Sequence, residues 1–286
     1  MTVLAIDIGG TKTLVALVRE GMAIEERRMA TDIADGPDAL LDAAAALAAP
    51  WAGRYRAVGA AVTGLVRHGT WRALNAATLD LPAGFPLADA LADRFGVPAR
   101  CVNDAQAAAW GEHVAGAGRH AADMAFLTVS TGIGGGLVLG GRLLEGLAGH
   151  FGQFVDETGT RAEDRAAGRW IAAEAEAQGR RGDAAAVFAR AGEDWAARLI
   201  ATSAARVAAL CRNVQLAVDP ERIVVGGGIG LAPGYLDRVR RALEAADPDI
   251  RPRIAPASLG PRAGLIGAAA LAVAMMETEL KEETAT

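Results

Sequence analysis

A glycine turn between two apolar stretches at the N-terminus constrains this chain more than any other feature. Residues 4–8 and 13–18 are mostly apolar, and the segment that joins them reads Asp7-Ile8-Gly9-Gly10-Thr11-Lys12. This pattern predicts two β-strands joined by a tight turn, with a carboxylate at the end of the first strand. Because glycine has no Cβ, the backbone N–H groups of such a turn can approach a phosphate closely. The turn is therefore either a structural hairpin or a cradle for phosphate.

Two further glycine clusters favour the phosphate interpretation. Residues 125–139 (AFLTVSTGIGGGLVL) repeat the pattern of two apolar stretches around a glycine turn, and a third cluster occupies Gly226–Gly230. Structural turns alone do not explain three such clusters. The sequence contains neither the P-loop spacing nor a complete dinucleotide-binding fingerprint. We therefore predict a duplicated fold whose two lobes close on one nucleotide, with the phosphates on the hairpins and the adenosine against the third cluster.

Composition narrows the class of protein. The 286 residues are 52% hydrophobic and 22% charged, which is typical of a globular protein. The net charge of −5, with no basic run, argues against nucleic acid as a main partner. No signal peptide or membrane span is predicted, since Asp7 and Lys12 interrupt the first apolar stretch. Cys101 and Cys211 lie in apolar segments, which predicts reduced core thiols and a cytoplasmic location.

The run Gly116-Ala117-Gly118 is the best candidate for a domain boundary. It divides the chain into 1–118 and 119–286, with the final predicted helix as the element of the second part able to pack back on the first. Strands alternate with helices after each hairpin, which favours an α/β fold with mixed sheets. Residues 63–69 are predicted as a loop, and 277–286 as a frayed tail. Helices are predicted over 35–49, 86–95, 105–114, 163–178, 184–217, 233–246 and 262–277.

A polar pair, Asn103-Asp104, stands where a predicted strand meets a predicted helix. An aspartate at this place can cap the N-terminus of the helix. A carboxylate in a closed, dry cleft can instead take the proton from a substrate hydroxyl as it attacks a γ-phosphoryl group. Both roles stay open for these neighbouring residues. A serine hydrolase is not expected, because Thr128–Gly132 lacks the first glycine of the nucleophile elbow and a β segment follows it.

Together these motifs resemble the ROK family, whose name stands for repressor, open reading frame and kinase, within the actin, hexokinase and Hsp70 superfamily. The resemblance implies an α/β, two-lobed, actin-like ATPase (ribonuclease H-like) fold with mixed sheets and a central nucleotide cleft. Family members are ATP-dependent sugar kinases or sugar-responsive repressors. Since the first hairpin starts at residue 4 and leaves no room for a helix-turn-helix domain, we expect the kinase. The matching motifs run in the family's order from about residue 3 to residue 276: Asp7–Lys12, Thr63-Gly64, Asn103–Ala105, Ser130–Gly136 and Val225–Gly228.

The same resemblance implies a set of site residues and the cofactors ATP and Mg²⁺. Asp104 corresponds to the general base, and Asp7 to the residue that orients Mg²⁺, in part through water. The residues that correspond to sugar ligands are Gly64, Asn75, Asn103, Asp104, His150 and Glu163. The residues that correspond to ATP ligands are Asp7, Gly9, Gly10, Thr11, Lys12, Thr131, Gly132, Gly134, Gly135, Gly227 and Gly228.

Within the family, the chain most resembles kinases that phosphorylate N-acetylmannosamine at its 6-hydroxyl, in sialic acid or amino-sugar catabolism. The segments that resemble them are Ala73–Asn75, Asn103–Trp110 and Gly146–His150, with a histidine at position 150 where many family members have a glutamate. Two alternatives stay open: a kinase for glucose, N-acetylglucosamine or allose, and a non-catalytic sugar sensor. A fused epimerase–kinase is not expected in 286 residues, unless the partner activity is on a separate polypeptide. The resemblance also implies a homodimer, with no nucleic acid or membrane partner.

One segment departs from the family pattern. Family members have a histidine and three clustered cysteines that bind a structural zinc, whereas this chain has Gln153 at the histidine position and no cysteine from Phe154 to Arg161. Two distant cysteines cannot complete a four-ligand site, so we expect no zinc. Glu163 follows this shortened segment and corresponds to a glutamate that contacts the sugar. Its alternative role is a solvated glutamate that the dipole of a helix N-terminus stabilises.

Overall fold

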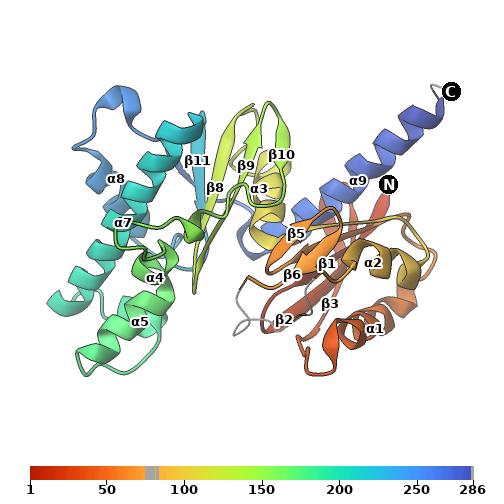
Figure 1. Ribbon diagram of the computed structural model, residues 1–286, viewed down its shortest axis with the longest axis horizontal. Helices are drawn as coiled ribbons and strands as arrows, with labels where there is room; N and C mark the ends of the chain where they lie inside the picture. Colours follow the sequence, from red (N-terminus) through yellow and green to blue (C-terminus); the bar gives the residue numbers. More distant parts are fainter. Residues whose placement is uncertain (75–80, 82–83, 285–286) are drawn as a thin grey trace. The chain divides into compact units, whose positions relative to one another are not determined.

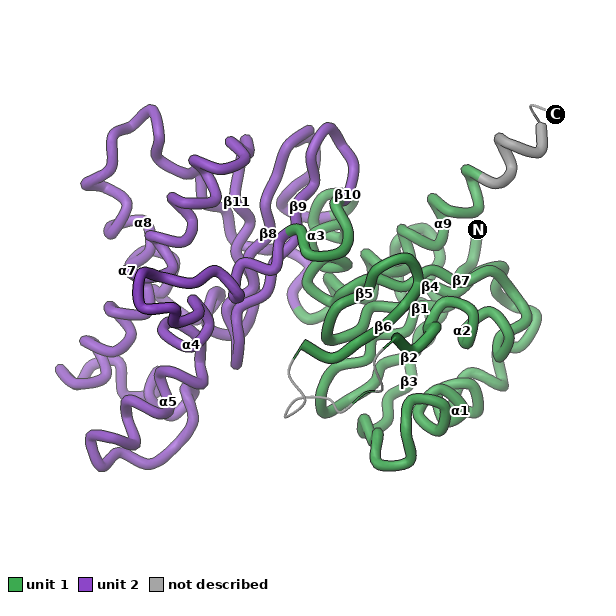
Figure 2. The backbone as a smooth tube through the Cα atoms, viewed as in Figure 1, with its two compact units in different colours: residues 1–115, 144–148, 261–286 green, residues 116–143, 149–260 purple. Residues whose placement is uncertain are grey.

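The computed structural model describes residues 1–74, 81 and 84–284 (Figure 1). The chain forms two compact units, which have different colours in Figure 2. Unit 1 comprises Met1–Ala115, Leu144–Ala148 and Pro261–Thr286, and unit 2 comprises Gly116–Leu143 and Gly149–Gly260. The chain therefore enters unit 1 three times, whereas the sequence predicted a single boundary at residue 118.

Unit 1 is built on a mixed five-stranded sheet. Strand β1 pairs antiparallel with β2 and parallel with β4, and β4 pairs parallel with β7. The first predicted hairpin is thus β1–β2, and the carboxyl ends of β1, β4 and β7 lie along one edge of the sheet. The order is β3-β2-β1-β4-β7, with bounds β1 (Thr2–Ile8), β2 (Lys12–Arg19), β3 (Met22–Ala30), β4 (Val58–Val62) and β7 (Ala99–Asn103).

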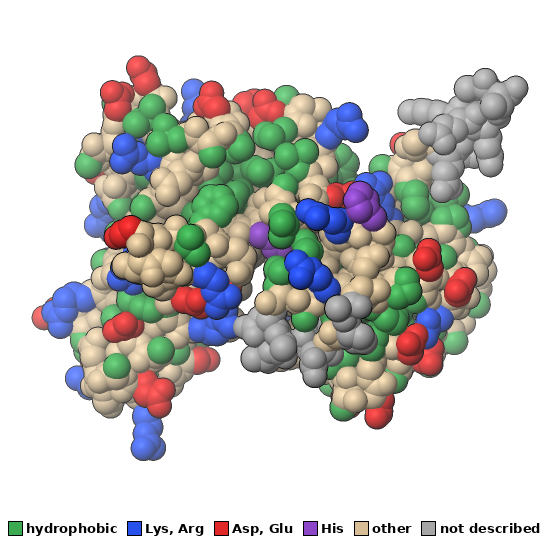
Figure 3. Space-filling view, in the orientation of Figure 1, with side chains coloured by type: hydrophobic (Ala, Val, Ile, Leu, Met, Phe, Trp, Pro, Cys, Tyr) green, Lys and Arg blue, Asp and Glu red, His purple; other side chains and the backbone are tan. Residues whose placement is uncertain are grey.

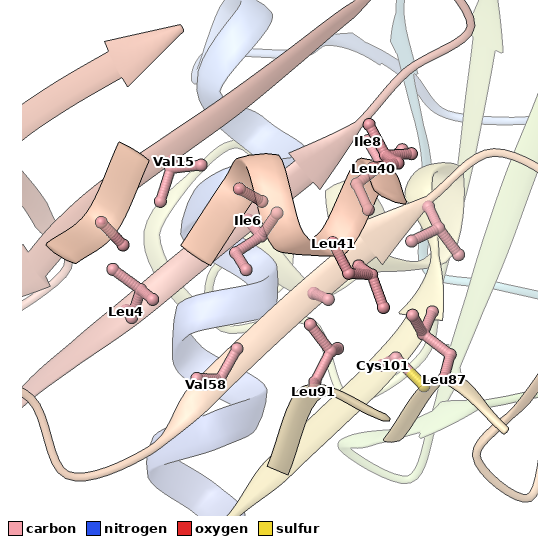
Figure 4. Close-up of a cluster of buried hydrophobic side chains, with 14 of the residues drawn as sticks. Leu4, Ile6, Ile8, Val15, Leu40, Leu41, Val58, Leu87, Leu91 and Cys101 are labelled. Atoms are coloured by element: carbon pink, nitrogen blue, oxygen red, sulfur yellow. The ribbon is translucent and has the colours of Figure 1, made fainter. Parts of the chain in front are cut away.

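Different helices cover the two faces of this sheet, because successive side chains of a strand point to opposite faces. Leu4, Ile6 and Ile8 of β1 lie in a core with side chains of α1 (Gly36–Ala48) and α2 (Leu87–Phe95), as Figure 4 shows. Val3 and Ala5 lie in a second core with residues of α9 (Ala263–Thr284). Strand β1 is therefore buried on both faces, which agrees with its nearly continuous apolar sequence.

Helix α3 (Asp104–Ala115) packs against α9 with the two backbones in direct contact. A Cβ on Gly111 of α3 would collide with the backbone of Ala263, and one on Gly267 of α9 would collide with the backbone of Ala107. Glycine permits this close approach because it has no side chain. Since α9 also packs on β1 and β4, the contact fixes the helix that begins at Asp104 to the sheet.

Unit 2 repeats the strand pattern of unit 1. Strand β8 pairs antiparallel with β9 and parallel with β11, which in turn pairs parallel with β12. The second predicted hairpin is thus β8–β9, and the predicted α/β fold with mixed sheets is confirmed. The order is β10-β9-β8-β11-β12, with bounds β8 (Met124–Val129), β9 (Ile133–Leu139), β10 (Arg142–Leu144), β11 (Arg222–Gly226) and β12 (Ile254–Pro256).

Two helices predicted as continuous are broken in unit 2. The predicted helix 163–178 is interrupted at Ala167, whose backbone is extended (φ −76°, ψ 175°). The N–H of Gly168 donates to the carbonyl of Ser130, so contact with the β8–β9 turn outweighs helix propensity there. The predicted helix 184–217 is interrupted over 189–193. The observed helices are α4 (Glu163–Ala166), α5 (Gly168–Ala177), α6 (Ala184–Phe188), α7 (Asp194–Val218) and α8 (Tyr235–Leu243).

Two smaller predictions are wrong. The segment 63–69, predicted as a loop, contains β5 (Leu65–Arg67), which pairs antiparallel with β6 (Thr70–Arg72). Helix α9, predicted over 262–277, continues to Thr284. The remaining short elements are the 3₁₀ turns Ala49–Trp51, Phe151–Gln153, Pro248–Ile250 and Gly260–Arg262.

The surface charge and the composition of the helices are relevant to the predictions about nucleic acid and membranes. On the face drawn in Figure 3, acidic and basic side chains are both present on each unit. Among the described residues, no helix combines the length and the apolar composition that crossing a bilayer requires.

Candidate active site

In unit 1 the candidate residues lie at the C-terminal ends of the parallel strands β1, β4 and β7. Asp7 is near the end of β1, Thr63 directly follows β4, and Asn103 is the last residue of β7. Strand register places Asp7 opposite Ala61 and Val62 opposite Asn103, so the three strand ends are adjacent. In sheets with parallel strands, this edge is where ligands bind.

The Asp104 carboxylate is held in place from two sides. Its Oδ2 accepts a hydrogen bond from Thr63 Oγ1 (3.0 Å), and its Oδ1 accepts from the N–H of Ala105 (2.8 Å) and from Asn103 Nδ2 (2.9 Å). Thr63 is itself fixed, because its carbonyl accepts from the indole N–H of the buried Trp71 (2.9 Å). The half-buried carboxylate is thus oriented at the N-terminus of α3, where the helix dipole stabilises negative charge.

Asn103 caps helix α3. Its Oδ1 accepts hydrogen bonds from the N–H groups of Ala105 (2.9 Å) and Gln106 (3.2 Å), and its Nδ2 donates to the carbonyl of Gly64 (2.8 Å) as well as to Asp104. The cap is therefore Asn103, which leaves the Asp104 carboxylate for another role. The sugar contact predicted for Asn103 stays a prediction, and within unit 1 this buried side chain already positions Gly64 and Asp104.

Asp7 is the most perturbed acid at this edge. Burial and, to a smaller extent, the nearby Asp104 raise the pKa of Asp7 from 3.8 to about 7, against the opposing effect of Lys12. Asp7 and Asp104 therefore form a pair of neighbouring carboxylates whose negative charges repel each other. Neighbouring carboxylates suit Mg²⁺, which proteins hold with one or two carboxylates and the phosphates of the substrate.

The β1–β2 turn has the form expected of a phosphate cradle. The N–H of Gly9 donates to the carbonyl of Lys12 (3.0 Å), which closes the turn, and Gly10, Thr11 and Lys12 are exposed. The carbonyl of Thr11 accepts from the N–H of Thr31 (3.1 Å), which ties the turn to the end of β3. Backbone hydrogen bonds thus hold both sides of the turn, while its tip is exposed to solvent.

In unit 2 the β8–β9 turn is joined to two other segments. The carbonyls of Ser130 and Thr131 accept from the N–H groups of Gly168 (2.8 Å) and Arg169 (3.1 Å) at the start of α5. The carbonyl of Val129 accepts from the N–H groups of residues 229 and 230, both at 3.0 Å, so the Gly227-Gly228 segment lies at the end of β8. The structure therefore brings Thr131, Gly132, Gly227 and Gly228 to the same end of the unit 2 sheet.

Gly135 and its neighbour Gly134 lie within β9, and Gly135 has a packing role. A Cβ on the buried Gly135 would overlap the ring of Phe151 and would stand 2.8 Å from the carbonyl of Gly149. The residues on both sides of His150 therefore rest directly on β9, and the half-buried His150 is placed by that contact. The ATP contact predicted for Gly135 stays a prediction.

Glu163, at the start of α4, is buried and surrounded by donors. Its Oε1 accepts from Gln153 Nε2 (2.9 Å) and lies 3.3 Å from Arg161 Nη1, and its Oε2 lies 3.2 Å from Arg169 Nη2. A Cβ on Gly132 would stand 3.0 Å from Oε2, so the carboxylate lies beside the β8–β9 turn. The Glu163 carboxylate is thus surrounded by hydrogen-bond donors within unit 2, so it is not a freely solvated glutamate.

Several of these residues were not among the predicted site residues. Thr63 was recognised only as part of a motif, although its position directly after a strand was a usable signal. The two arginines beside Glu163 have no sequence pattern that marks them. Gly264 of α9 lies beside Asp7, because a Cβ there would stand 3.5 Å from Asp7 Oδ2. Asn75, predicted as a sugar ligand, lies outside the described residues.

The two cysteines lie in the cores of separate units and are free. Burial raises the pKa of both thiols to about 12, so they stay protonated and make poor metal ligands. In the part of the chain that the structure describes, no group of three or more His, Cys, Asp or Glu side chains is arranged to hold a metal ion.

The fold and the site define the class of protein: two sheets of like topology, each with a glycine turn between its antiparallel strands, as in the actin-like ATPases. The chain belongs to the ROK family, whose profile matches residues 3–275. The resemblance inferred from the sequence motifs is thereby confirmed.

Named relatives agree with this assignment. The chain is 48% identical over 278 residues to the bifunctional enzyme NanE/NanK of Brucella melitensis, an alignment that covers 94% of this chain and 54% of that protein. It thus spans about half the length of that relative. It is 42% identical over 287 residues to the N-acetylmannosamine kinase of Citrobacter koseri, with 95% and 99% of the two chains covered.

A solved structure gives the same result. A ROK family glucokinase from Streptomyces griseus, in complex with glucose and AMPPNP, superposes with a TM-score of 0.79 at 29% identity, covering 95% of this chain and 99% of that one. The fold implied by the sequence resemblance is therefore also confirmed.

Proposed function

We propose that this protein is an ATP-dependent sugar kinase that transfers the γ-phosphoryl group of ATP to the 6-hydroxyl of N-acetylmannosamine. The observation that carries the proposal is the Asp104 carboxylate, held by Thr63, Asn103 and the N–H of Ala105 beside the acidic Asp7 in a ROK chain. The name of the Citrobacter koseri relative, which the chain matches over nearly its whole length, supports the choice of sugar.

In the proposed reaction, Asp104 accepts the proton of the sugar hydroxyl as its oxygen attacks the γ-phosphorus. The hydrogen bonds from Thr63 and Ala105 hold one carboxylate orientation, so little reorganisation is needed when the proton arrives. Asp7 would hold Mg²⁺, which neutralises charge on the transferring phosphoryl group when bound. The homodimeric state and the cytoplasmic location also remain predictions.

Each unit contributes its own ligands in this proposal. From unit 1, the Gly9–Lys12 turn would hold phosphate, and Gly64 and Asn103 would contact the sugar. From unit 2, the Thr131-Gly132 turn would hold phosphate, the Gly227-Gly228 segment would contact adenosine, and His150 and Glu163 would contact the sugar. AMPPNP in the Streptomyces griseus complex, an ATP analogue, supports the use of ATP. Hydrogen bonds to sugar hydroxyls discriminate well, since an analogue without the hydroxyl leaves a buried polar group unpaired.

The test is ADP production with Mg-ATP against a panel of N-acetylmannosamine, N-acetylglucosamine, mannose, glucose and allose. We expect the highest kcat/KM with N-acetylmannosamine. A higher kcat/KM with another sugar of the panel would contradict the choice of substrate and keep the kinase. Sugar binding without turnover of any of them would contradict the kinase and favour a sugar sensor.

We also expect the purified protein to hold far less than one zinc per chain and to keep its activity after dialysis against a chelator with Mg²⁺ restored. Gln153 replaces the histidine ligand of the family motif, and the protonated, buried Cys101 and Cys211 cannot supply thiolates. Elemental analysis of protein purified without added metal makes the measurement. Stoichiometric zinc would contradict the prediction.

A further inference from the structure

Gln153 joins two segments that the proposed function assigns to the sugar. Its backbone N–H donates to the carbonyl of His150 (3.0 Å), and its side-chain Nε2 donates to Glu163 Oε1 (2.9 Å). One residue therefore sets the distance between the His150 segment and the Glu163 carboxylate, and both contacts lie within unit 2.

The backbone around Gln153 is fixed by a small hairpin. The N–H of Ala162 donates to the carbonyl of Phe154 (2.7 Å), and Val155 forms a bridge with Arg161. Inside this hairpin, the Asp156 carboxylate accepts from the N–H groups of Thr158 (2.9 Å) and Thr160 (3.0 Å) and pairs with Arg165 of α4. These contacts hold the residue before the hairpin, Gln153, close to the residue after it, Glu163.

The contacts around Glu163 are not equivalent. Arg161 and Arg169 reach it with long side chains that are 36% and 42% exposed, at distances of 3.3 and 3.2 Å. Both arginine contacts are longer than the 2.9 Å bond from Gln153 Nε2, and they come from longer side chains with more rotatable bonds. Of the contacts to Oε1, only the Gln153 bond has an ordinary hydrogen-bond length, since Arg161 Nη1 stands at 3.3 Å. Gln153 is therefore the contact best able to fix the position of Oε1.

We propose that Gln153 is a positioning residue that holds Glu163 and the His150 segment at the spacing that the sugar requires. The inference rests on the proposed function, in which His150 and Glu163 contact the sugar. Arg169 holds the other oxygen beside Gly132, so the carboxylate plane is defined from both ends. Loss of the Gln153 bond leaves Oε1 with only the longer contact to Arg161, so the carboxylate is positioned less precisely, which weakens sugar binding and leaves the phosphate turn unchanged.

The test is a double-mutant cycle with Gln153→Met and Glu163→Ala. Methionine matches the length of glutamine but cannot donate, and Gln153 is exposed, so the substitution does not open the core. In the wild-type background we expect Gln153→Met to raise the KM for N-acetylmannosamine by about tenfold, the scale of a hydrogen bond to a charged group, with little change in kcat or in the KM for ATP. In the Glu163→Ala background the same change has little effect on the sugar KM. The matched control is Gln178→Met, at an exposed glutamine after α5, which leaves both KM values unchanged.

An unchanged sugar KM in Gln153→Met, or an equal factor in both backgrounds, would overturn the inference while the kinase activity of the wild type stands. Absence of turnover with the wild type would instead contradict the proposed function. If the wild type shows no turnover, the double-mutant cycle is measured by urea unfolding midpoints instead of KM values. Additive midpoint shifts would overturn the inference, and a Gln153→Met shift that disappears in the Glu163→Ala background supports it.

Discussion

Asp104→Asn lowers kcat by about 10²-fold or more, the scale for loss of a general base. The substitution removes the carboxylate that accepts the proton of the sugar hydroxyl in the proposed reaction. It keeps the local structure, because an asparagine Oδ1 can still accept from the N–H of Ala105 and its Nδ2 can donate to the Thr63 hydroxyl, which accepts as well as donates. Sugar and ATP binding therefore change much less than kcat does.

The measurement is the initial rate of ADP formation with saturating Mg-ATP and the preferred sugar. A matched control is Asp93→Asn, at an exposed aspartate of α2 in the same unit, which removes the same charge and leaves kcat unchanged. Turnover of Asp104→Asn close to that of the wild type would contradict the assignment of the base. Loss of the circular dichroism signal at 222 nm would attribute a low rate to unfolding instead.

The elements with the strongest apolar patterns could be predicted from the sequence. Strand β1 is apolar on both faces, so residues 3–8 could hardly form anything but a buried strand, and the glycine turn after it needed no tertiary information. The helix 163–178 has a periodic pattern, yet it breaks at Ala167 because Gly168 bonds to the β8–β9 turn. That contact joins residues far apart in the chain, so local propensity could not show it.

The candidate site divides in the same way. Asp7 and Asp104 could be found because each lies where a strand ends, and their motifs resemble those of a known family. The environment of Glu163 could not be found, since Gln153, Arg161 and Arg169 come together through a hairpin with no characteristic sequence. The functions of Asn103 and Asp104 were open between a cap and a base, and the structure assigns the cap to Asn103 through its bonds to the N–H groups of Ala105 and Gln106.

Asp7→Asn stabilises the ligand-free protein above neutral pH while it abolishes activity. Burial and the nearby Asp104 raise the pKa of Asp7 from 3.8 to about 7 in the folded chain. Between these two values the folded state binds a proton that the unfolded state has released, so the free energy of unfolding falls as the pH rises. The loss begins near pH 4 and is complete somewhat above pH 7.

The magnitude follows from the same difference. At about 1.4 kcal/mol for each pKa unit, a pKa raised to about 7 corresponds to a loss of about 4 kcal/mol at most. The side chain is only half-buried, and solvent therefore reduces the effect to about 2–3 kcal/mol. An asparagine has no charge at any pH, so Asp7→Asn should be more stable than the wild type at pH 8 by this amount and nearly equal to it at pH 4.

Urea unfolding of both proteins in EDTA, from pH 4 to pH 8, measures the effect, and the buried Trp51 and Trp71 report on unit 1 by fluorescence. The control Asp35→Asn, at an exposed aspartate before α1, should follow the wild-type curve at every pH. If Asp7→Asn shows the same pH dependence as the wild type, the carboxyl is not perturbed.

The same unfolding experiment with Mg-ATP in place of EDTA connects this stability to function. A bound ligand stabilises the folded state in proportion to the logarithm of its concentration relative to Kd. If Asp7 holds Mg²⁺, the wild type gains this stabilisation and Asp7→Asn gains much less, so their order of stability at pH 8 reverses. An equal gain in both proteins would place Mg²⁺ elsewhere. A reversal would mean that the carboxylate that destabilises the ligand-free protein stabilises the Mg-ATP complex.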